Sequence, residues 1–328
     1  MIEKSLLEVK NLLTQFTSES GIVNAVNDVS FQIKEGQTVC IVGESGCGKS
    51  ATAMSIMGLI EPTSGGVTGG EILFEGHDLL KMSKGDLRRL RGNDLSMIFQ
   101  EPMSSLNPVL TIGEQITEPL REHELLSKKE AKRKAIELIE LVGIGRSHEI
   151  FHSYPHQLSG GMLQRIMIAI ALCCNPRLLI ADEPTTALDV TIQAQILELL
   201  RTLKERRQMA MLLITHDLGV VAEVADYVIV MYAGKVIEHA PVVELFKNPK
   251  HPYTKGLLAA KPVINQRKES LYTIPGQVPN LVDLKPSCYF SARCRQCMDI
   301  CTTKMPRLVE DEEGHSVACW LYEEAKVQ

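Results

Sequence analysis

The sequence predicts an α/β fold in which helices cover a largely parallel sheet. Two apolar runs, at residues 38–42 and 178–181, have the composition of buried parallel strands. The first leads into a glycine-rich stretch and then a helix-forming segment, while the second ends at Asp182 and Glu183. Aromatic residues make up only 5% of the chain, and this scarcity beside abundant aliphatic residues is typical of helix-covered parallel sheets.

Length, charge and hydropathy limit the classes of protein. A chain of 328 residues is long enough for two domains, or for one domain with an appendage. The net charge of −5 implies no broad basic face for nucleic acid. No apolar run approaches the ~18 residues of a membrane span, and the residues after Met1 lack a signal-peptide core. We therefore expect a cytoplasmic protein whose membrane contacts are peripheral.

Residues 43–50 read Gly-Glu-Ser-Gly-Cys-Gly-Lys-Ser, which is a G-x-x-x-x-G-K-S pattern between a strand and a helix. Glycines allow successive backbone N–H groups to point inward as an anion nest, and the helix adds its N-terminal partial positive charge. We predict that Lys49 binds the β- and γ-phosphates and that Ser50 binds Mg²⁺. The predicted contacts to a nucleotide are Gly43, Glu44, Ser45, Gly46, Cys47, Gly48, Lys49, Ser50 and Ala51.

The segments 6–10 and 24–33 show the partial alternation of exposed strands. Phe16 lies between them in a polar stretch, where an aromatic ring is either an edge-strand residue or a flat platform for a purine. Further strands are expected at 71–76 and at 95–99, the latter ending at Gln100.

A helical region follows the prolines at 102 and 108. Ser127 and Glu130 form a capping box at the start of an amphipathic helix, and Gly143 ends this helix. We expect a helical subdomain over about residues 103–175.

At the end of this region, residues 158–161 read Leu-Ser-Gly-Gly and lead into another helix, which Pro176 stops. The Ser-Gly-Gly sequence at a helix start is either an ordinary cap or a second anion site.

Polar residues follow the two later buried strands. Asp182 comes at the end of its strand, where a Mg²⁺-associated aspartate is presented beside a phosphate loop. Glu183 is placed to orient or deprotonate an attacking water; the alternative is a solvated acidic strand end. His216 follows the apolar run 210–215 and could contact a γ-phosphate, although a lone histidine there is more often structural. The runs 227–231 and 235–237 are expected to form a closing hairpin.

In this order, these motifs closely resemble the ATP-binding subunit of ABC transporters over about residues 5–245. Leu-Ser-Gly-Gly distinguishes this family from other phosphate-loop enzymes. The resemblance implies a P-loop NTPase core of ABC type with an antiparallel β subdomain and a helical subdomain. It divides the chain into a nucleotide-binding domain, 1–248, and an accessory C-terminal extension, 249–328. One departure is Met162, where many relatives have Gln.

The resemblance also implies the roles of individual residues. Two subunits would bind two ATP molecules head to tail, so that one chain holds half of each site. The implied catalytic residues are Glu183, His216 as γ-phosphate sensor, and Gln100 as link to the helical subdomain. The implied Mg²⁺ ligands are Ser50, Gln100 and Asp182. The further implied contacts are Phe16 on adenine, Asp189 at the dimer interface, and Ser159, Gly160 and Gly161 on the partner's ATP.

Three C-terminal segments, 251–254, 274–279 and 286–294, resemble the peptide and nickel importer branch of the family. That branch implies ATP-driven import of dipeptides, oligopeptides or nickel at the cytoplasmic face of the inner membrane. The implied partners are two membrane-spanning permeases, a second related ATPase in a heterodimer and, indirectly, an extracytoplasmic solute-binding protein. Nucleic acid is not an expected partner.

Cysteines are concentrated near the end of the chain, and in a cytosolic protein such a group suggests metal binding before disulfides. Four thiolates suit zinc or an iron–sulfur cluster. Some family members carry a [4Fe-4S] cluster at matching positions, so we favour a cluster in segment 286–320, with zinc or unligated thiols as alternatives. The predicted ligands are Cys288, Cys294, Cys301 and Cys319, and Cys297 is an additional candidate.

Two other functions fit part of the sequence. A soluble ABC ATPase acting on nucleic acid or ribosomes usually has two cassettes or long coiled-coil insertions, whereas this chain has one copy of each motif, no heptad run and no basic patch. A phosphate-loop kinase or GTPase would leave Leu-Ser-Gly-Gly and His216 without a purpose. Both readings are therefore disfavoured.

Overall fold

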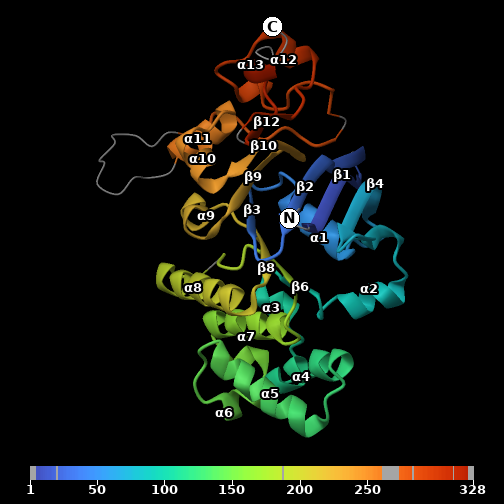
Figure 1. Cartoon of the computed structure of the whole chain (residues 1–328), viewed down its shortest axis with the longest axis vertical. Helices are drawn as coiled ribbons and strands as arrows, with labels where there is room; N and C mark the ends of the chain where they lie inside the picture. Colours follow the sequence, from blue (N-terminus) through green and yellow to red (C-terminus); the bar gives the residue numbers. More distant parts are fainter. Residues whose placement is uncertain are drawn as a thin grey trace. The chain divides into compact units, whose positions relative to one another are not determined.

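A computed structural model describes residues 5–19, 21–186, 188–260, 273–282, 284–312 and 314–323 (Figure 1). The chain divides into two compact units. We call the described residues within 1–6, 34–37 and 81–213 the helical unit, and the described residues within 7–33, 38–80 and 214–328, which include the predicted phosphate loop, the loop unit.

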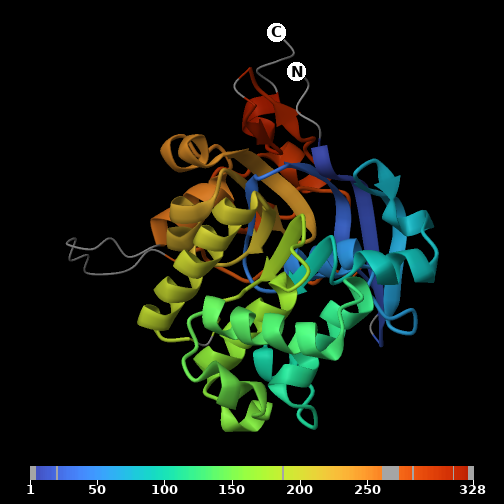
Figure 2. The ribbon, with the colours of Figure 1, turned by 60° about the horizontal axis from the view of Figure 1, so that its bottom comes forward.

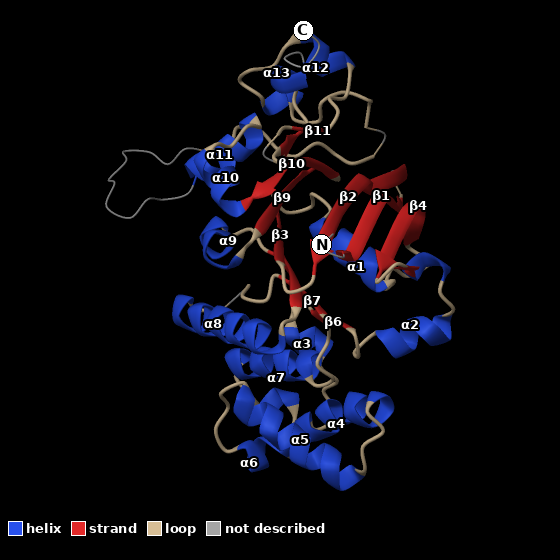
Figure 3. Cartoon of the chain, viewed as in Figure 1, coloured by secondary structure: helices blue, strands red, loops and turns tan. Residues whose placement is uncertain are grey.

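The loop unit contains a four-stranded antiparallel sheet in the order β2-β1-β4-β5. Its strands are β1 (Ser5–Ser18), β2 (Gly21–Lys34), β4 (Gly65–Phe74) and β5 (His77–Asp78). The antiparallel sheet predicted for this region is confirmed, and β1, β2 and β4 are drawn side by side in Figure 3. The strands are longer than expected. Phe16 therefore lies within β1, opposite Gly65 of β4, and not in a connection between strands.

The loop unit also contributes the strand series β11-β12-β10-β9-β3. These strands are β3 (Thr38–Val42), β9 (Tyr227–Tyr232), β10 (Lys235–Pro241), β11 (Val309–Glu310) and β12 (Ser316–Val317). Strand β3 is parallel to β9, and every residue of β3 is buried. Strands β9 and β10 form the predicted hairpin through Ala233 and Gly234, which both have positive φ. Helices of this unit are α1 (Lys49–Met57), α9 (Leu218–Val224), α10 (Val242–Lys247), α11 (Pro252–Ala260), α12 (Asp299–Thr303) and α13 (Trp320–Glu323).

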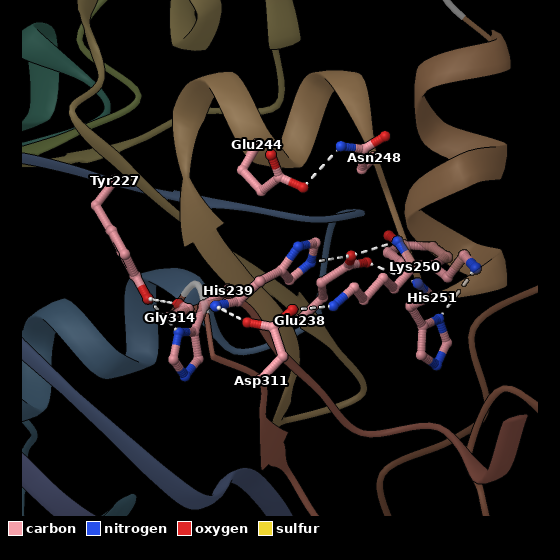
Figure 4. A network of polar contacts seen from close by, with 11 residues as sticks. Tyr227, Glu238, His239, Glu244, Asn248, Lys250, His251, Asp311 and Gly314 are labelled. Atoms are coloured by element: carbon pink, nitrogen blue, oxygen red, sulfur yellow. Dashed lines mark hydrogen bonds and ion pairs between the residues drawn. The ribbon is translucent and has the colours of Figure 1, made fainter. Parts of the chain in front are cut away.

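The C-terminal extension joins this sheet because β12 pairs antiparallel with β10. A buried polar network fastens the two together (Figure 4). The carboxylate of Glu238, which is fully buried, accepts hydrogen bonds from His315 Nε2 at 2.7 Å and from the backbone N–H groups of Lys250 at 2.6 Å and His251 at 2.9 Å. The Lys250 ammonium in turn pairs with Asp311. The extension is therefore held by specific polar contacts as well as by strand pairing.

The helical unit contains the parallel strands β6 (Leu95–Ile98) and β7 (Leu178–Asp182) and most of β8 (Ala210–Ile214). Its helices are α2 (Lys84–Leu90), α3 (Pro102–Ser105), α4 (Ile112–His123), α5 (Lys128–Leu141), α6 (Ser147–Phe151), α7 (Gly160–Leu172) and α8 (Val190–Arg207). Helices α4, α5 and α6 lie together in both Figure 1 and Figure 2. The structure thus has helices throughout the region where a helical subdomain is expected.

Local capping explains where these helices begin. Ser127 and Glu130 form the predicted capping box of α5, and Gly143, with φ 76°, follows its C-terminal end. A second capping box, Thr111 with Glu114, starts α4 and was not predicted. Within the described residues, no helix has both the length and the apolar character that spanning a membrane requires.

Candidate nucleotide-binding site

The predicted phosphate loop connects β3 to α1 in the loop unit. Gly48 caps α1 with φ 101°, and a Cβ atom there would lie 2.2 Å from the carbonyl oxygen of Ala25. A residue with a side chain would therefore be strained and would also collide with the backbone. The first turn of α1 contains no acidic residue, so the positive end of its dipole is not neutralised within the helix. Both features suit an anion-binding loop.

The Lys49 ammonium is folded back over this loop. Lys49 is only 5% exposed, and its Nζ donates to the carbonyl oxygens of Gly43 at 2.8 Å and Glu44 at 3.0 Å. The neighbouring Cys47 side chain is fully buried, and burial raises the pKa of its thiol although Lys49 acts in the opposite direction. Cys47 is therefore a neutral packing residue. Lys49 is the cation of the loop, and its ammonium group can exchange these two carbonyl oxygens for phosphate oxygens.

The other predicted loop contacts differ in exposure. Ser45 and Gly46 are exposed at the tip of the loop, while Ser50 and Ala51 are half-buried in the first turn of α1. Phe16 is also half-buried in β1. His216 is exposed two residues after β8, and the preceding Thr215 N–H donates to Ile41 of β3 at 3.2 Å. This bond places the histidine segment beside the strand that leads into the loop.

Two predicted catalytic residues are in direct contact in the helical unit. Asp182 is 4% exposed at the end of β7, and the following Glu183 has a left-handed backbone with φ 46°. The Glu183 Oε2 accepts hydrogen bonds from Gln100 Nε2 at 3.2 Å and from Thr186 Oγ1 at 2.8 Å. Thr186 was not predicted. In the sequence, only its position three residues after a strand-end glutamate could have indicated this hydrogen bond.

Two helices begin at the residues that are predicted to contact the partner's ATP or the dimer interface. Ser159 caps α7, and its side chain accepts the N–H of Met162 at 3.4 Å. Gly160 is exposed, with open space where a Cβ would lie. Asp189 is exposed and caps α8 by accepting the N–H of Ile192 at 3.0 Å. Capping by Ser159 is thus observed, and it leaves the glycine backbone accessible at the N-terminus of α7.

The structure does not support the predicted metal cluster. Cys288, Cys294, Cys301 and Cys319 line one cavity, but its volume of about 10 Å³ is no larger than one water requires. Burial raises the pKa of Cys288 to about 12 and that of Cys319 to about 11, so both thiols are protonated when no metal is bound. Among the described residues, no group of three or more His, Cys, Asp or Glu side chains is arranged to hold a metal ion. The four cysteines predicted as ligands therefore lie around one cavity, but among the described residues they are not arranged as a set of metal ligands.

Comparison with known proteins decides the family. Residues 26–186 match the ABC transporter family, and residues 237–301 match the oligopeptide/dipeptide transporter C-terminal region. The oligopeptide transport ATP-binding protein AppD of Bacillus subtilis is 55% identical over 98% of both chains. The chain belongs to the ATP-binding subunits of ABC transporters. The dipeptide transport ATP-binding protein DppD of the same organism is 50% identical over 98% of this chain and 96% of its own.

Solved structures agree with this assignment. The dimeric ATP-binding cassette MJ0796, solved in a post-hydrolysis state with ADP and phosphate, is 29% identical. It covers 72% of this ABC subunit and 98% of its own chain, with a TM-score of 0.65. The predicted ABC-type fold, the ATPase activity and the peptide-importer branch are confirmed. The alternative of an ABC ATPase acting on nucleic acid or ribosomes is not favoured.

Proposed function

We propose that this ATPase subunit powers the import of peptides through two membrane-spanning permease partners. The observation that carries this proposal is the 55% identity to an oligopeptide transport protein along the whole chain, because it includes the C-terminal extension as well as the cassette. Other relatives are named for dipeptide or peptide transport. We accordingly assign peptides, and not nickel, as the transported solute. Such a role places the chain at the cytoplasmic face of the inner membrane as a peripheral subunit.

The loop residues support a mechanism for ATP binding. The backbone N–H groups from Gly46 to Ser50 bind the phosphates, and Lys49 exchanges the carbonyl groups of Gly43 and Glu44 for phosphate oxygens. The oxygen atoms of Ser50, Gln100 and Asp182 are hard ligands that would hold Mg²⁺, and the ion would supply positive charge to offset that of the triphosphate. Phe16, half-buried in β1, supplies the ring on which adenine stacks.

Glu183 is the proposed general base. Its contact with Gln100 holds the carboxylate at the end of β7, and it orients or deprotonates the water that attacks the γ-phosphate. The exposed His216 contacts the same phosphate. The hydrogen bond from Thr186 is a second restraint on the Glu183 side chain.

We also propose that the active form is a head-to-tail dimer with a second, related ATPase. The support is that Ser159, Gly160 and Asp189 are exposed at the starts of α7 and α8. Ser159 and Asp189 cap these helices and still face solvent, where a partner could contact them. The two solved MJ0796 cassettes are described as dimeric. The isolated chain should therefore bind ATP readily and hydrolyse it slowly.

A [4Fe-4S] cluster or a zinc ion in the extension stays a prediction. Its support is the common cavity of the four cysteines, and metal binding would have to displace their protons and widen that cavity. Anaerobic purification of the full chain tests it. About four irons per chain and a brown colour would support the cluster, one zinc would support the alternative, and metal-free protein would refute both.

The proposed function is tested with Glu183→Gln in a transporter reconstituted in vesicles with its permeases and binding protein. ATP binding should persist while phosphate release and peptide uptake fall by about a hundredfold or more. Glu101→Gln is the matched control, because Glu101 is an exposed carboxylate adjacent to Gln100 in the chain. Normal turnover of Glu183→Gln would refute the general-base role, and wild-type vesicles that hydrolyse ATP without taking up any peptide would refute the solute class.

A further inference from the structure

Glu44, in the phosphate loop, is held by the C-terminal extension. Its two carboxylate oxygens each accept a hydrogen bond of 3.1 Å from Arg293 Nη1. Its backbone N–H donates to the hydroxyl of Tyr253 at 2.9 Å. Both partners lie beyond residue 248, so the conformation of a loop residue depends on a segment more than two hundred residues away in the chain.

Arg293 is in turn fixed within the extension. The side chain is 5% exposed, and its Nε donates to the carbonyl oxygen of Pro275 at 2.8 Å. Its Nη1 also reaches the hydroxyl of Tyr232 at 3.3 Å, and the guanidinium lies 5.7 Å from the centre of that ring. Because these contacts set the orientation of the guanidinium, Arg293 presents a fixed positive charge to Glu44.

The position of Glu44 makes this charge relevant to ATP. The Glu44 carbonyl oxygen is 3.0 Å from the Lys49 ammonium, which is the cation of the loop. The triphosphate would bring several negative charges to this ammonium group. Those charges would therefore also approach Glu44, the residue that carries the carboxylate. A carboxylate without a counter-ion would repel those charges, whereas an Arg–carboxylate pair is close to neutral.

We propose that Arg293 is a positioning residue for ATP binding: by pairing with Glu44, it neutralises that carboxylate and holds the phosphate loop ready for the triphosphate. This inference rests on the assignment of the loop to ATP under the proposed function. It gives the extension a part in nucleotide affinity, in addition to any role in docking to other subunits.

The test measures equilibrium ATP affinity of the full-length protein in five variants. Arg293→Gln should weaken ATP binding by about tenfold, the effect expected when a buried charged partner is removed. Glu44→Gln alone should change affinity by less than about threefold, and Glu44→Gln combined with Arg293→Gln should restore affinity to the level of Glu44→Gln. Arg295→Gln, an exposed arginine in the same segment, is the matched control and should bind ATP normally.

Lys49→Ala separates this inference from the assignment beneath it. Loss of binding in Lys49→Ala with normal binding in Arg293→Gln would overturn only the role of Arg293. Normal binding in Lys49→Ala would overturn the assignment of the loop. A loss in Arg293→Gln that Glu44→Gln does not rescue would show general damage to the extension and would also overturn the proposal, because only charge neutralisation predicts rescue.

Discussion

Acid is expected to loosen the C-terminal extension because His251 is buried in its neutral form. The side chain is 2% exposed and lies at the start of α11, where its Nδ1 accepts the N–H of Tyr253 at 3.0 Å. Burial lowers the pKa of His251 to about 4; the Glu238 carboxylate opposes this shift and Lys255 adds to it. An unfolded chain would protonate the same histidine near its ordinary pKa of 6.5.

The direction and size of the effect follow from this difference. A histidine whose pKa is lowered on folding stabilises the folded state above the unfolded pKa, and this stabilisation is lost as the pH falls from 6.5 towards 4. Between pH 7.5 and pH 5 the loss is about 2 kcal/mol, because each unit of pH below 6.5 costs about 1.4 kcal/mol. Burial also lowers the pKa of His239 to about 4, so it acts in the same direction. The lowered pKa of Glu238 matters only below the unfolded value of 4.5.

The single tryptophan of the chain makes this measurable. Trp320 lies in α13 of the extension, and its indole N–H donates to Lys304 at 3.1 Å. Urea unfolding followed by its fluorescence at pH 7.5 and pH 5 gives the free energy for this segment. His251→Asn keeps an acceptor for the Tyr253 N–H but cannot be protonated, so it should lose about 2 kcal/mol less than wild type on acidification.

An exposed histidine provides the control. His148→Gln should leave the pH dependence of the Trp320 signal unchanged because His148 is an exposed residue of α6, which does not belong to the extension. Equal pH dependence in His251→Asn and wild type would refute the reasoning. It would mean that His251 is protonated as easily in the folded chain as in the unfolded one.

Four further substitutions test other parts of the structure. Gly48→Ala should abolish ATP binding and lower the thermal midpoint, because its Cβ would lie 2.2 Å from the Ala25 carbonyl, whereas Gly46→Ala, in open space at φ 77°, should cost only about 1–2 kcal/mol; equal losses would contradict this. Gln115→Leu should cost about 2–3 kcal/mol in denaturant unfolding, since its side chain makes three hydrogen bonds to loop backbone, and an unchanged free energy would contradict it. Ser159→Ala should remove a cap worth about 1 kcal/mol while ATP affinity of the isolated chain stays normal, and its hydrolysis defect should be seen only in the assembled transporter.

Much of the fold was predictable because its signals are local. The phosphate loop, the capping box of α5 and the β9–β10 hairpin each depend on residues within one short segment. The length of β1 was not predictable in this way, because residues 11–18 are largely polar. Thr14 shows the reason: it is fully buried, and its hydroxyl is satisfied by Ser55 of α1 at 2.8 Å. A polar residue can thus belong to a buried strand when its partner comes from another element.

The candidate site shows the same distinction. Gln100 and Glu183 are 83 residues apart, yet the parallel pairing of Ile98 with Ala181 brings the ends of their strands together. Since both residues follow buried strands, their contact could have been anticipated from the rule that ligands bind at carboxyl ends of parallel strands. The pairing of Arg293 with Glu44 spans 249 residues and has no such rule. For the cysteines, spacing indicated proximity, but protonation and cavity size depend on packing that the sequence does not contain.

The acid sensitivity of His251 and the pairing of Arg293 lead to one joint expectation. If acid loosens the extension, the guanidinium no longer neutralises Glu44, and ATP affinity should fall for a reason unrelated to the nucleotide's own protonation. Wild type should therefore lose more ATP affinity between pH 7.5 and pH 5 than Glu44→Gln does, since the variant has no carboxylate to expose. Titration with ATP at both pH values measures this, and protonation of ATP cancels in the comparison. Parallel losses in the two proteins would show that the extension and the phosphate loop are not coupled through this pair.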